Sequence, residues 1–260
     1  MEISGKSYHL RFNPKSILPA LWHKSLMVVY RFVDYLCCLP QRLWRVVRHL
    51  WVGLQGVLSL SLDSDWRSIW RQRLPMWCLE LLIYLLECLG IGELYETLQD
   101  WVKFNTRPMY DWEIELARSV FGDSINYRRV RIDEMAVLGP RQKHFYYVSF
   151  YIINSWGPMQ DSILLHELTH VWQYERMGAV YMPRALKAQF SRYGYNYGGI
   201  SALKAYLRKG KDFLSFNLEQ QGDIVSDYHR LKKGYQPRWG NGSRSDLPIY
   251  EAFIQQMRRI

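Results

Sequence analysis

The stretch HELTHVWQ, residues 166–173, determines both the fold and the chemistry predicted for this chain. His166 and His170 are four residues apart, so on a helix both imidazoles project from one face and can bind one metal ion. Glu167 follows the first histidine, and from there its carboxylate can reach a metal-bound water without being a ligand itself. These residue types at this spacing predict a Zn²⁺-dependent hydrolase site with Glu167 as its catalytic base.

The helix predicted to carry this motif has sequence signals at both ends. Asp161 or Ser162 can cap its start, and Gly178, which follows Met177, can end it. Its apolar residues recur at helical spacing, so the helix can pack on a core while its histidines face another element. This apolar side consists of Leu164, Leu165, Leu168, Val171 and Trp172.

A catalytic zinc site has three protein ligands and an open position for water, so a third ligand must come from elsewhere in the chain. The positions three and six residues after the second histidine hold Gln173 and Arg176, so the metzincin continuation is absent. The segment FNLEQQGD, residues 216–223, predicts a second helix capped by Asn217. We predict that Glu219 of this helix completes the metal site.

The same helix carries the other metal-site candidates. Asp223 lies one turn after Glu219, and we predict that it accepts a hydrogen bond from the free nitrogen of a histidine ligand. Gly222 costs about 1 kcal/mol relative to Ala in a helix, which a close approach to the histidine helix would explain. Asp223, Asp227 and His229 stay open as alternative ligands to Glu219.

A hydrogen-bond donor that stabilises the oxyanion beside the metal is also expected. The loop SRYGYNYGG, residues 191–199, offers Tyr193, Tyr195 and Tyr197, and the Glu219 helix offers His229. The sequence does not choose among these four candidates.

The rest of the second half mixes helices and short strands. The residue pattern predicts a helix at 111–121, a half-buried strand at 129–133 and a more fully buried strand at 145–153. With the two ligand-bearing helices, these elements predict an α+β fold with a zincin-like catalytic domain over residues 107–260. The change in pattern near residues 105–108 predicts the domain boundary.

The first part of the chain, residues 1–106, is hydrophobic, rich in tryptophan and predicted to be mostly α-helical. Prolines interrupt it, and a proline inside a helix removes a hydrogen bond and clashes with the preceding turn. We therefore expect breaks at Pro40 and Pro75. The expected helices are at about 20–39, 41–60 and 76–89.

Three arginines recur at every third position in the second of these helices: Arg42, Arg45 and Arg48. A basic helix with an apolar, tryptophan-bearing side can lie on an anionic membrane surface. The alternative is a helix that packs on the second half of the protein with its arginines in water.

The chain of 260 residues has a formal net charge of +10, which favours anionic partners. No groove-reading motif accompanies this charge, so no specific nucleic acid is expected as a partner. No segment reaches the about 20 apolar residues of a transmembrane helix. Residues 1–15 lack a signal-peptide pattern, so we expect a cytoplasmic protein whose export would need a signal-peptide-independent secretion system.

Three segments, in this order along the chain, resemble a known family. They are DWEIELARSVFGDSINYRRVRID at 111–133, LLHELTHVWQYE at 164–175 and FNLEQQGDIVSDY at 216–228. The family is that of the zincin-like HExxH metallopeptidase domains of bacterial Rhs- and Vgr-related proteins, which are associated with type VI secretion.

The resemblance covers roughly residues 107–235 and implies a metallopeptidase-like fold. It places His166, Glu167 and His170 at the motif positions and Glu219 at the matching acidic position. It also implies a bacterial secreted effector or toxin, and it supplies no substrate.

Three functions follow from these observations. The leading one is a gluzincin-like zinc metallopeptidase that acts on a protein or peptide substrate. The second is a membrane-active or membrane-docked protein whose zinc site is structural or accessory. The third is a degenerate zincin that binds a partner without cutting it, against which the intact Glu167 argues.

Overall fold

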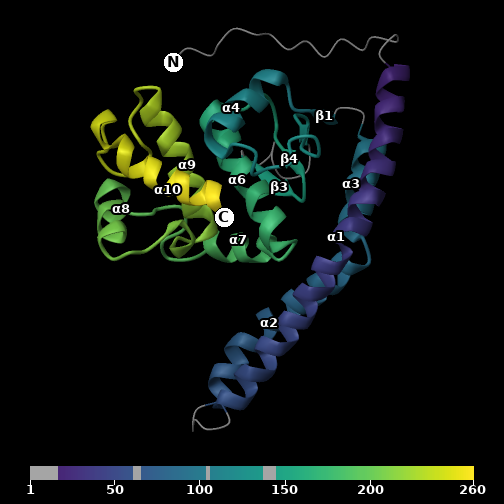
Figure 1. Cartoon of the computed structure of the whole chain (residues 1–260), viewed down its shortest axis with the longest axis horizontal. Coiled ribbons are helices and arrows are strands. Elements are labelled where there is room, and N and C mark those ends of the chain that lie inside the picture. The colour runs from purple at the N-terminus through teal and green to yellow at the C-terminus, as the bar shows by residue number, and fades with distance from the viewer. Residues whose placement is uncertain (1–16, 61–65, 104–105, 137–144) are drawn as a thin grey trace.

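The computed structural model of the chain describes residues 17–60, 66–103, 106–136 and 145–260. Figure 1 shows a long helical arm beside a second part that contains the sheet and the other helices. The arm consists of α1 (Ile17–Leu60), α2 (Trp66–Cys88) and α3 (Ile91–Val102). Residues 1–15, for which the sequence predicts no signal peptide, lie outside the described residues.

The sheet has four short strands in the order β1-β2-β4-β3. The central pair, β2 and β4, is parallel, and both outer pairs are antiparallel. A small mixed sheet among many helices confirms the predicted α+β class. The strands are β1 (Thr106–Pro108), β2 (Arg131–Asp133), β3 (Tyr147–Ser149) and β4 (Ile152–Asn154).

Helices pack around this sheet and enclose the hydrophobic core. Trp172 of the HELTHVWQ helix is fully buried and belongs to one cluster of buried residues with Ile132 and Ile153 of the sheet and Phe253 near the C-terminus. The helices are α4 (Asp111–Phe121), α6 (Asp161–Met177), α7 (Tyr181–Gln189), α8 (Gly199–Arg208), α9 (Leu218–Lys232) and α10 (Leu247–Arg259), with short 3₁₀ turns at Phe213–Ser215 and Arg244–Asp246.

The predicted helix breaks at the two prolines are wrong. Pro40 lies inside α1, which runs unbroken for 44 residues, and Pro75 lies inside α2. A proline in a helix interior costs about 3 kcal/mol, so other contacts must keep the helix continuous. In α1 these are buried ion pairs on either side of the proline, from Arg31 to Glu96 and from Arg42 to Glu93.

The predicted strand at 145–153 is also wrong, because this segment forms a tight hairpin. β3 and β4 pair antiparallel, and Phe150 between them has a φ of 58°. A bulky residue in this left-handed region is strained, so its surroundings must hold it there. The Phe150 ring packs against Tyr95 and Tyr174, with ring centroids 5.5 and 5.6 Å away.

The strand predicted at 129–133 is shorter, spanning Arg131–Asp133, and it is buried on both faces. Its polar side chains are covered by the arm. The Lys103 ammonium lies 2.6 Å from the Asp133 carboxylate, and Arg129, just before the strand, pairs with Glu96. The prediction of a half-buried strand fails because its polar face meets charged partners instead of water.

The arm turns its charged side chains inward and its apolar side chains outward. Arg42 pairs with Glu93 of α3, and Arg45 lies 3.8 Å from Glu87 and donates to carbonyls at the end of α6. Only Arg48 of the three arginines is exposed. The alternative in which all three arginines are in water is therefore wrong, because Arg42 and Arg45 bond to other parts of the chain.

Within the described residues, no single helix has both the length and the apolarity of a membrane span. One pair of consecutive helical segments, Arg73–Cys88 and Ile91–Val102, reaches that length and apolarity together, but it bends by 67° between the two.

Candidate metal centre

The helix that carries the motif, α6, is held by its apolar side. Leu164, Leu165 and Leu168 are at most 1% exposed. The helix ends at Met177, and its C-cap Gly178 has a φ of 75°, as the sequence predicts. The predicted cap at Asp161 or Ser162 is wrong: Asp161 is the first helical residue, and the cap position belongs to Gln160, which makes no side-chain capping bond.

The second helix, α9, begins at the predicted cap. The Asn217 side chain accepts from the Gln220 backbone N–H at 2.8 Å, and the Gln220 side chain accepts from the Asn217 N–H at 3.1 Å. Gly222 lies where α9 meets α6. A Cβ at this position would come within 2.6–2.9 Å of three atoms of the His166 ring, so the predicted close approach is confirmed.

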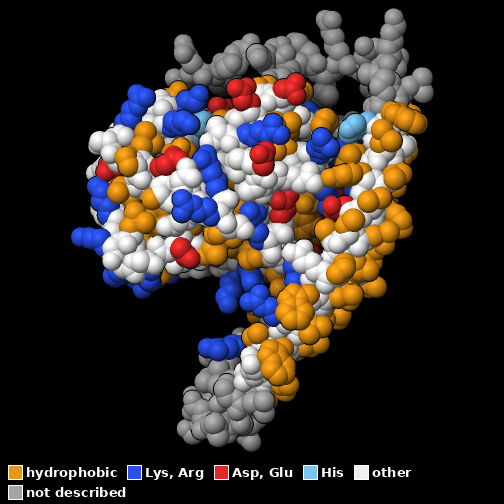
Figure 2. Space-filling view, in the orientation of Figure 1, with side chains coloured by type: hydrophobic (Ala, Val, Ile, Leu, Met, Phe, Trp, Pro, Cys, Tyr) orange, Lys and Arg blue, Asp and Glu red, His pale blue; other side chains and the backbone are white. Residues whose placement is uncertain are grey.

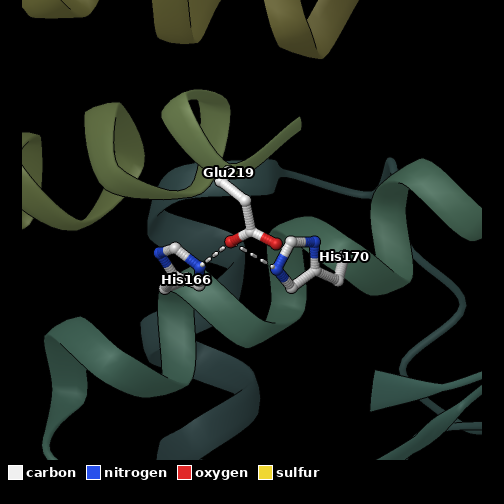
Figure 3. A group of neighbouring side chains, drawn as sticks. All are labelled: His166, His170 and Glu219. Atoms are coloured by element: carbon white, nitrogen blue, oxygen red, sulfur yellow. Dashed lines mark hydrogen bonds and ion pairs between the residues drawn. The ribbon is translucent and has the colours of Figure 1, made fainter. Parts of the chain in front are cut away.

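Figure 3 shows the two histidines of α6 pointing at the carboxylate of Glu219, which descends from α9. The Glu219 Oε2 atom lies 3.3 Å from the His166 Nε2 atom and 3.5 Å from the His170 Nε2 atom. One ligand atom from each residue lies within 4.8 Å of the others, and all three residues are buried. In a tetrahedron with bonds of about 2.0–2.1 Å, ligand atoms are about 3.3–3.4 Å apart. The three ligand atoms are of the kinds that zinc binds, and the two separations from the Glu219 oxygen match those of neighbouring zinc ligands.

The other ring nitrogens of the two histidines already have acceptors. The His166 Nδ1 atom lies 2.8 Å from the Asp223 Oδ1 atom, the contact predicted for Asp223. The His170 Nδ1 atom lies 2.8 Å from the Gln173 Oε1 atom. Because an acceptor draws the ring proton to Nδ1, both Nε2 atoms are left with lone pairs toward Glu219 when the rings are neutral.

Sequence reasoning missed the role of Gln173. Its side-chain amide donates to the Leu218 carbonyl and to the Gln221 side chain, each at 2.9 Å. It therefore fixes the His170 ring and also ties α6 to the first turn of α9. The available signal was its position three residues after His170, on the same face of the helix.

The carboxylates of the centre shift the pKa values of its two histidines. Burial opposes protonation of His166, but its bonds to Asp223 and Glu219 outweigh burial and raise its pKa well above the usual value. For His170, too, the pull of Glu219 exceeds the effect of burial, and its pKa is raised. Burial alone would raise the pKa of Glu219, but the two histidines lower it to about 2. The carboxylates therefore favour positive charge on the two imidazoles.

Glu167 lies beside this cluster and is not part of it. Its side chain is buried, and its Oε2 atom has no hydrogen-bond partner among the described residues. Burial raises its pKa, which favours a carboxyl group that holds a proton more readily than one in water. A buried carboxylate oxygen without a partner is costly, so an occupant of the centre is expected to contact it.

Of the four oxyanion candidates, the structure brings only Tyr195 to the centre. Its ring centroid is 5.9 Å from that of His166, and burial followed by the charges of Glu219 and Glu167 raises its pKa. Tyr193 is 67% exposed. The hydroxyl of Tyr197 is buried away from the centre, where it donates to Asp227 and contacts Tyr250.

The other rival ligands are also placed outside the centre. Asp227 accepts hydrogen bonds from Tyr197 and from the backbone N–H groups of Arg238 and Trp239, so it anchors a loop. His229 lies 3.6 Å from Asp161, at the far end of α6. Ten residues of helix, about 15 Å, separate it from Glu219.

Two further tyrosines near the centre carry no recognisable signal in the sequence. Tyr181 of α7 is buried 6.2 Å from His170 between ring centroids, and its hydroxyl donates to the carbonyl of Val148 in β3. For Tyr146, burial and the nearby Glu167 raise its pKa. Its ring stacks on Trp156. Both tyrosines come from segments outside the two motifs, and only the folding of the chain brings them near the centre.

Comparison with known proteins gives one similarity to report. The chain is 31% identical over 146 residues, half of its length, to the type VI secretion system spike protein VgrG2b of Pseudomonas aeruginosa. The chain spans only 13% of that protein's length. No family model and no solved structure matches. The chain thus has a partial relative among Vgr proteins, in agreement with the Vgr side of the resemblance seen in the sequence.

Proposed function

We propose that this chain is a gluzincin-like zinc metallopeptidase. The observation that carries the proposal is the convergence of His166, His170 and Glu219 from two helices, with Glu167 buried beside them and unpaired. Two neutral imidazoles and one carboxylate are a ligand set of catalytic zinc sites. Such a set leaves a fourth position for water or substrate.

The roles of the residues follow from their positions. His166, His170 and Glu219 would hold the ion, while Asp223 and Gln173 orient the two imidazoles. A zinc ion held there would lower the pKa of a bound water and polarise the scissile carbonyl. Glu167 takes the proton of the attacking water and passes it to the leaving amine, and its raised pKa suits this transfer. Tyr195, whose ring centroid is 5.9 Å from that of His166, would donate a hydrogen bond to the oxyanion.

The proposed setting is that of an effector delivered by a type VI secretion machine. The similarity to a type VI spike protein supports this setting, and the chain corresponds to a small part of that protein. We expect a protein or peptide substrate, because this ligand set and this general base are suited to the hydrolysis of peptide bonds.

The deciding experiment is the metal content of the purified chain. We expect about one zinc per chain, the stoichiometry of a site with three protein ligands. The zinc should be lost in His166→Ala and in Glu219→Ala. His229→Ala is the matched control, since it removes another buried histidine, on α9 but outside the centre, and should retain the metal.

Two results would contradict the proposal. One is a wild-type chain that is free of zinc after purification without chelators and takes up none on titration. The other is loss of zinc in His229→Ala with retention in Glu219→Ala, which would move the site along α9.

A further inference from the structure

The arm presents an outer surface that is apolar over most of its length. Figure 2 shows hydrophobic side chains along the edge of α1 that faces away from the rest of the chain. We call this surface the outer face. On α1 it comprises exposed side chains that include Trp22, Leu26, Val29, Val33, Leu36, Leu43, Trp44, Val47, Leu50, Trp51 and Leu54.

The outer face of α1 is wider than a coiled-coil seam. At 100° per residue, its positions together with Val28, Phe32 and Val57 spread over about 160° of the helix circumference, and the exposed Val52 lies beyond that arc. A seam that pairs with one other helix uses a narrower stripe, two residues in seven. The width of the outer face indicates that its partner is a broad apolar surface and not a single helix.

The neighbouring helices extend the same pattern. α3 turns Glu93, Glu96 and Asp100 inward and exposes Leu94 and Leu98 on the opposite side. α2 buries Glu80 and Glu87 and exposes leucines such as Leu82 and Leu85. The inward charges of α1 and α3 meet Arg129, which belongs to the second part of the chain. The apolar sides of these two helices therefore face away from that part.

Charged groups are nearly absent from this surface. Among residues 21–57 and 73–103, whose side chains are described, the exposed charged residues are Arg48 and Arg73. A protein–protein interface has a polar, solvent-accessible rim around its apolar centre. Hydrocarbon requires no such rim, because it offers nothing to hydrogen-bond.

We propose that the outer face of the arm docks on a lipid bilayer, with α1 lying along the membrane surface. At 44 residues α1 is about 66 Å long, more than twice the ~30 Å hydrocarbon thickness, so it lies along the bilayer instead of crossing it. Trp22, Trp44 and Trp51 are spaced along the face, as suits a residue enriched at membrane interfaces. The net charge of +10 adds attraction to anionic headgroups.

This docking would hold the metal centre above the bilayer, with the arm between them. It uses a different surface from the basic helix face considered in the sequence, since Arg42 and Arg45 are buried in ion pairs. It is also independent of the metallopeptidase proposal, because none of its residues belongs to the metal centre.

The test is flotation of the full-length chain with vesicles of phosphatidylcholine alone and of phosphatidylcholine with phosphatidylglycerol. The chain should float with both, and the bound fraction should persist at about 1 M salt, where the Debye length is only ~3 Å. The double variant Trp44→Asp, Trp51→Asp should lose at least about tenfold in vesicle affinity, because two large apolar contacts are removed. Phe190→Asp is the matched control: Phe190 is 80% exposed in the second part and outside the arm, so this variant should float like the wild type.

Both substitutions replace exposed side chains, and circular dichroism should show unchanged helix content. Absence of flotation would overturn the proposal. Flotation only at low salt and only with anionic vesicles would overturn it too, since it would assign binding to the basic surface. A stable dimer in light scattering that Trp44→Asp, Trp51→Asp dissociates would assign the outer face to a second copy of the chain instead.

Discussion

The arm and the metal centre both bury acidic side chains, and they differ in the groups that pair with these side chains. In the arm, Glu96 meets two arginines, Arg31 and Arg129, at 3.1 and 3.2 Å. At the metal centre, Glu167 has an unpartnered oxygen, and Glu219 meets only histidines. Buried charges are costly unless paired. Guanidinium groups meet Glu96 in the arm, although the Arg31 Nη1 and Arg129 Nε atoms have no hydrogen-bond partner among the described residues, whereas only imidazoles meet Glu219 at the centre.

The comparison teaches how to separate a structural cluster from a functional one in the same chain. Both contain several titratable groups with shifted pKa values, so the shifts alone do not distinguish them. What differs is the resident positive charge. In the arm cluster the positive charge is on guanidinium groups, which stay protonated. At the centre it is on imidazoles, which release their protons to solvent when a metal ion binds.

The largest expected effect is on activity at the centre. Glu167→Gln should lower peptide hydrolysis by about 10³-fold or more, because the general base is removed while the three metal ligands stay in place. Zinc content should be unchanged, and stability should be equal or higher because a buried carboxyl without a partner is replaced by a neutral amide. Turnover of an unstructured protein substrate, metal analysis and denaturant unfolding measure the three quantities. A variant with full activity would refute the assigned role.

The corresponding change in the arm should give the reverse result. Glu96→Ala leaves Arg31 and Arg129 without their shared carboxylate in a buried setting, so we expect a loss of about 3–5 kcal/mol in the free energy of unfolding. Zinc content of the folded protein should not change. Urea titration gives the stability, and Glu115→Ala, at an exposed acid of α4, is the control that should cost little. Loss of zinc without loss of stability in Glu96→Ala would erase the distinction between the two clusters.

A smaller effect is expected from filling the space between α6 and α9. In Gly222→Ala the new Cβ would meet the His166 ring at 2.6 Å, so the ring or the helix must shift and zinc affinity should fall by about 10–100-fold. Gly56→Ala in α1 is the matched helical control, since a Cβ there meets nothing within 4 Å. That control should leave zinc affinity unchanged and stabilise the arm by about 0.5–1 kcal/mol. Equal zinc affinity in both variants would mean that the tight packing at Gly222 is not needed for the site.

The two regions also differ in how far sequence predicts them. At the centre, local rules suffice: the i, i+4 spacing of His166 and His170, the cap at Asn217 and the otherwise unfavourable Gly222 each have one physical explanation. In the arm, Pro40 gives a local signal that buried ion pairs override. The inward turn of Arg42 depends on Glu93, which is 51 residues away and carries no local mark.

The same reason explains the oxyanion candidates. Tyr193, Tyr195 and Tyr197 have equal standing in the sequence because a loop has no fixed periodicity. Which of them faces the histidines depends on the path of the loop across α9. That path is fixed by contacts such as Asp227 to Tyr197, between residues 30 positions apart.

The last prediction concerns pH and separates the imidazoles of the centre from the guanidinium groups of the arm. Without metal, the carboxylates around His166 and His170 raise the pKa of both imidazoles, so each holds its proton to higher pH than a free imidazole does. A zinc ligand must be neutral, so metal binding displaces these protons. Apparent zinc affinity should therefore fall as pH is lowered from about 8 to about 6, by roughly tenfold per unit for each proton displaced. Competition against a chelator of known pH dependence measures this slope, and Asp223→Asn should make it shallower, because removing that carboxylate lowers the His166 pKa. A pH-independent affinity over this range would show that the histidines are already neutral and that the carboxylates do not hold protons on them.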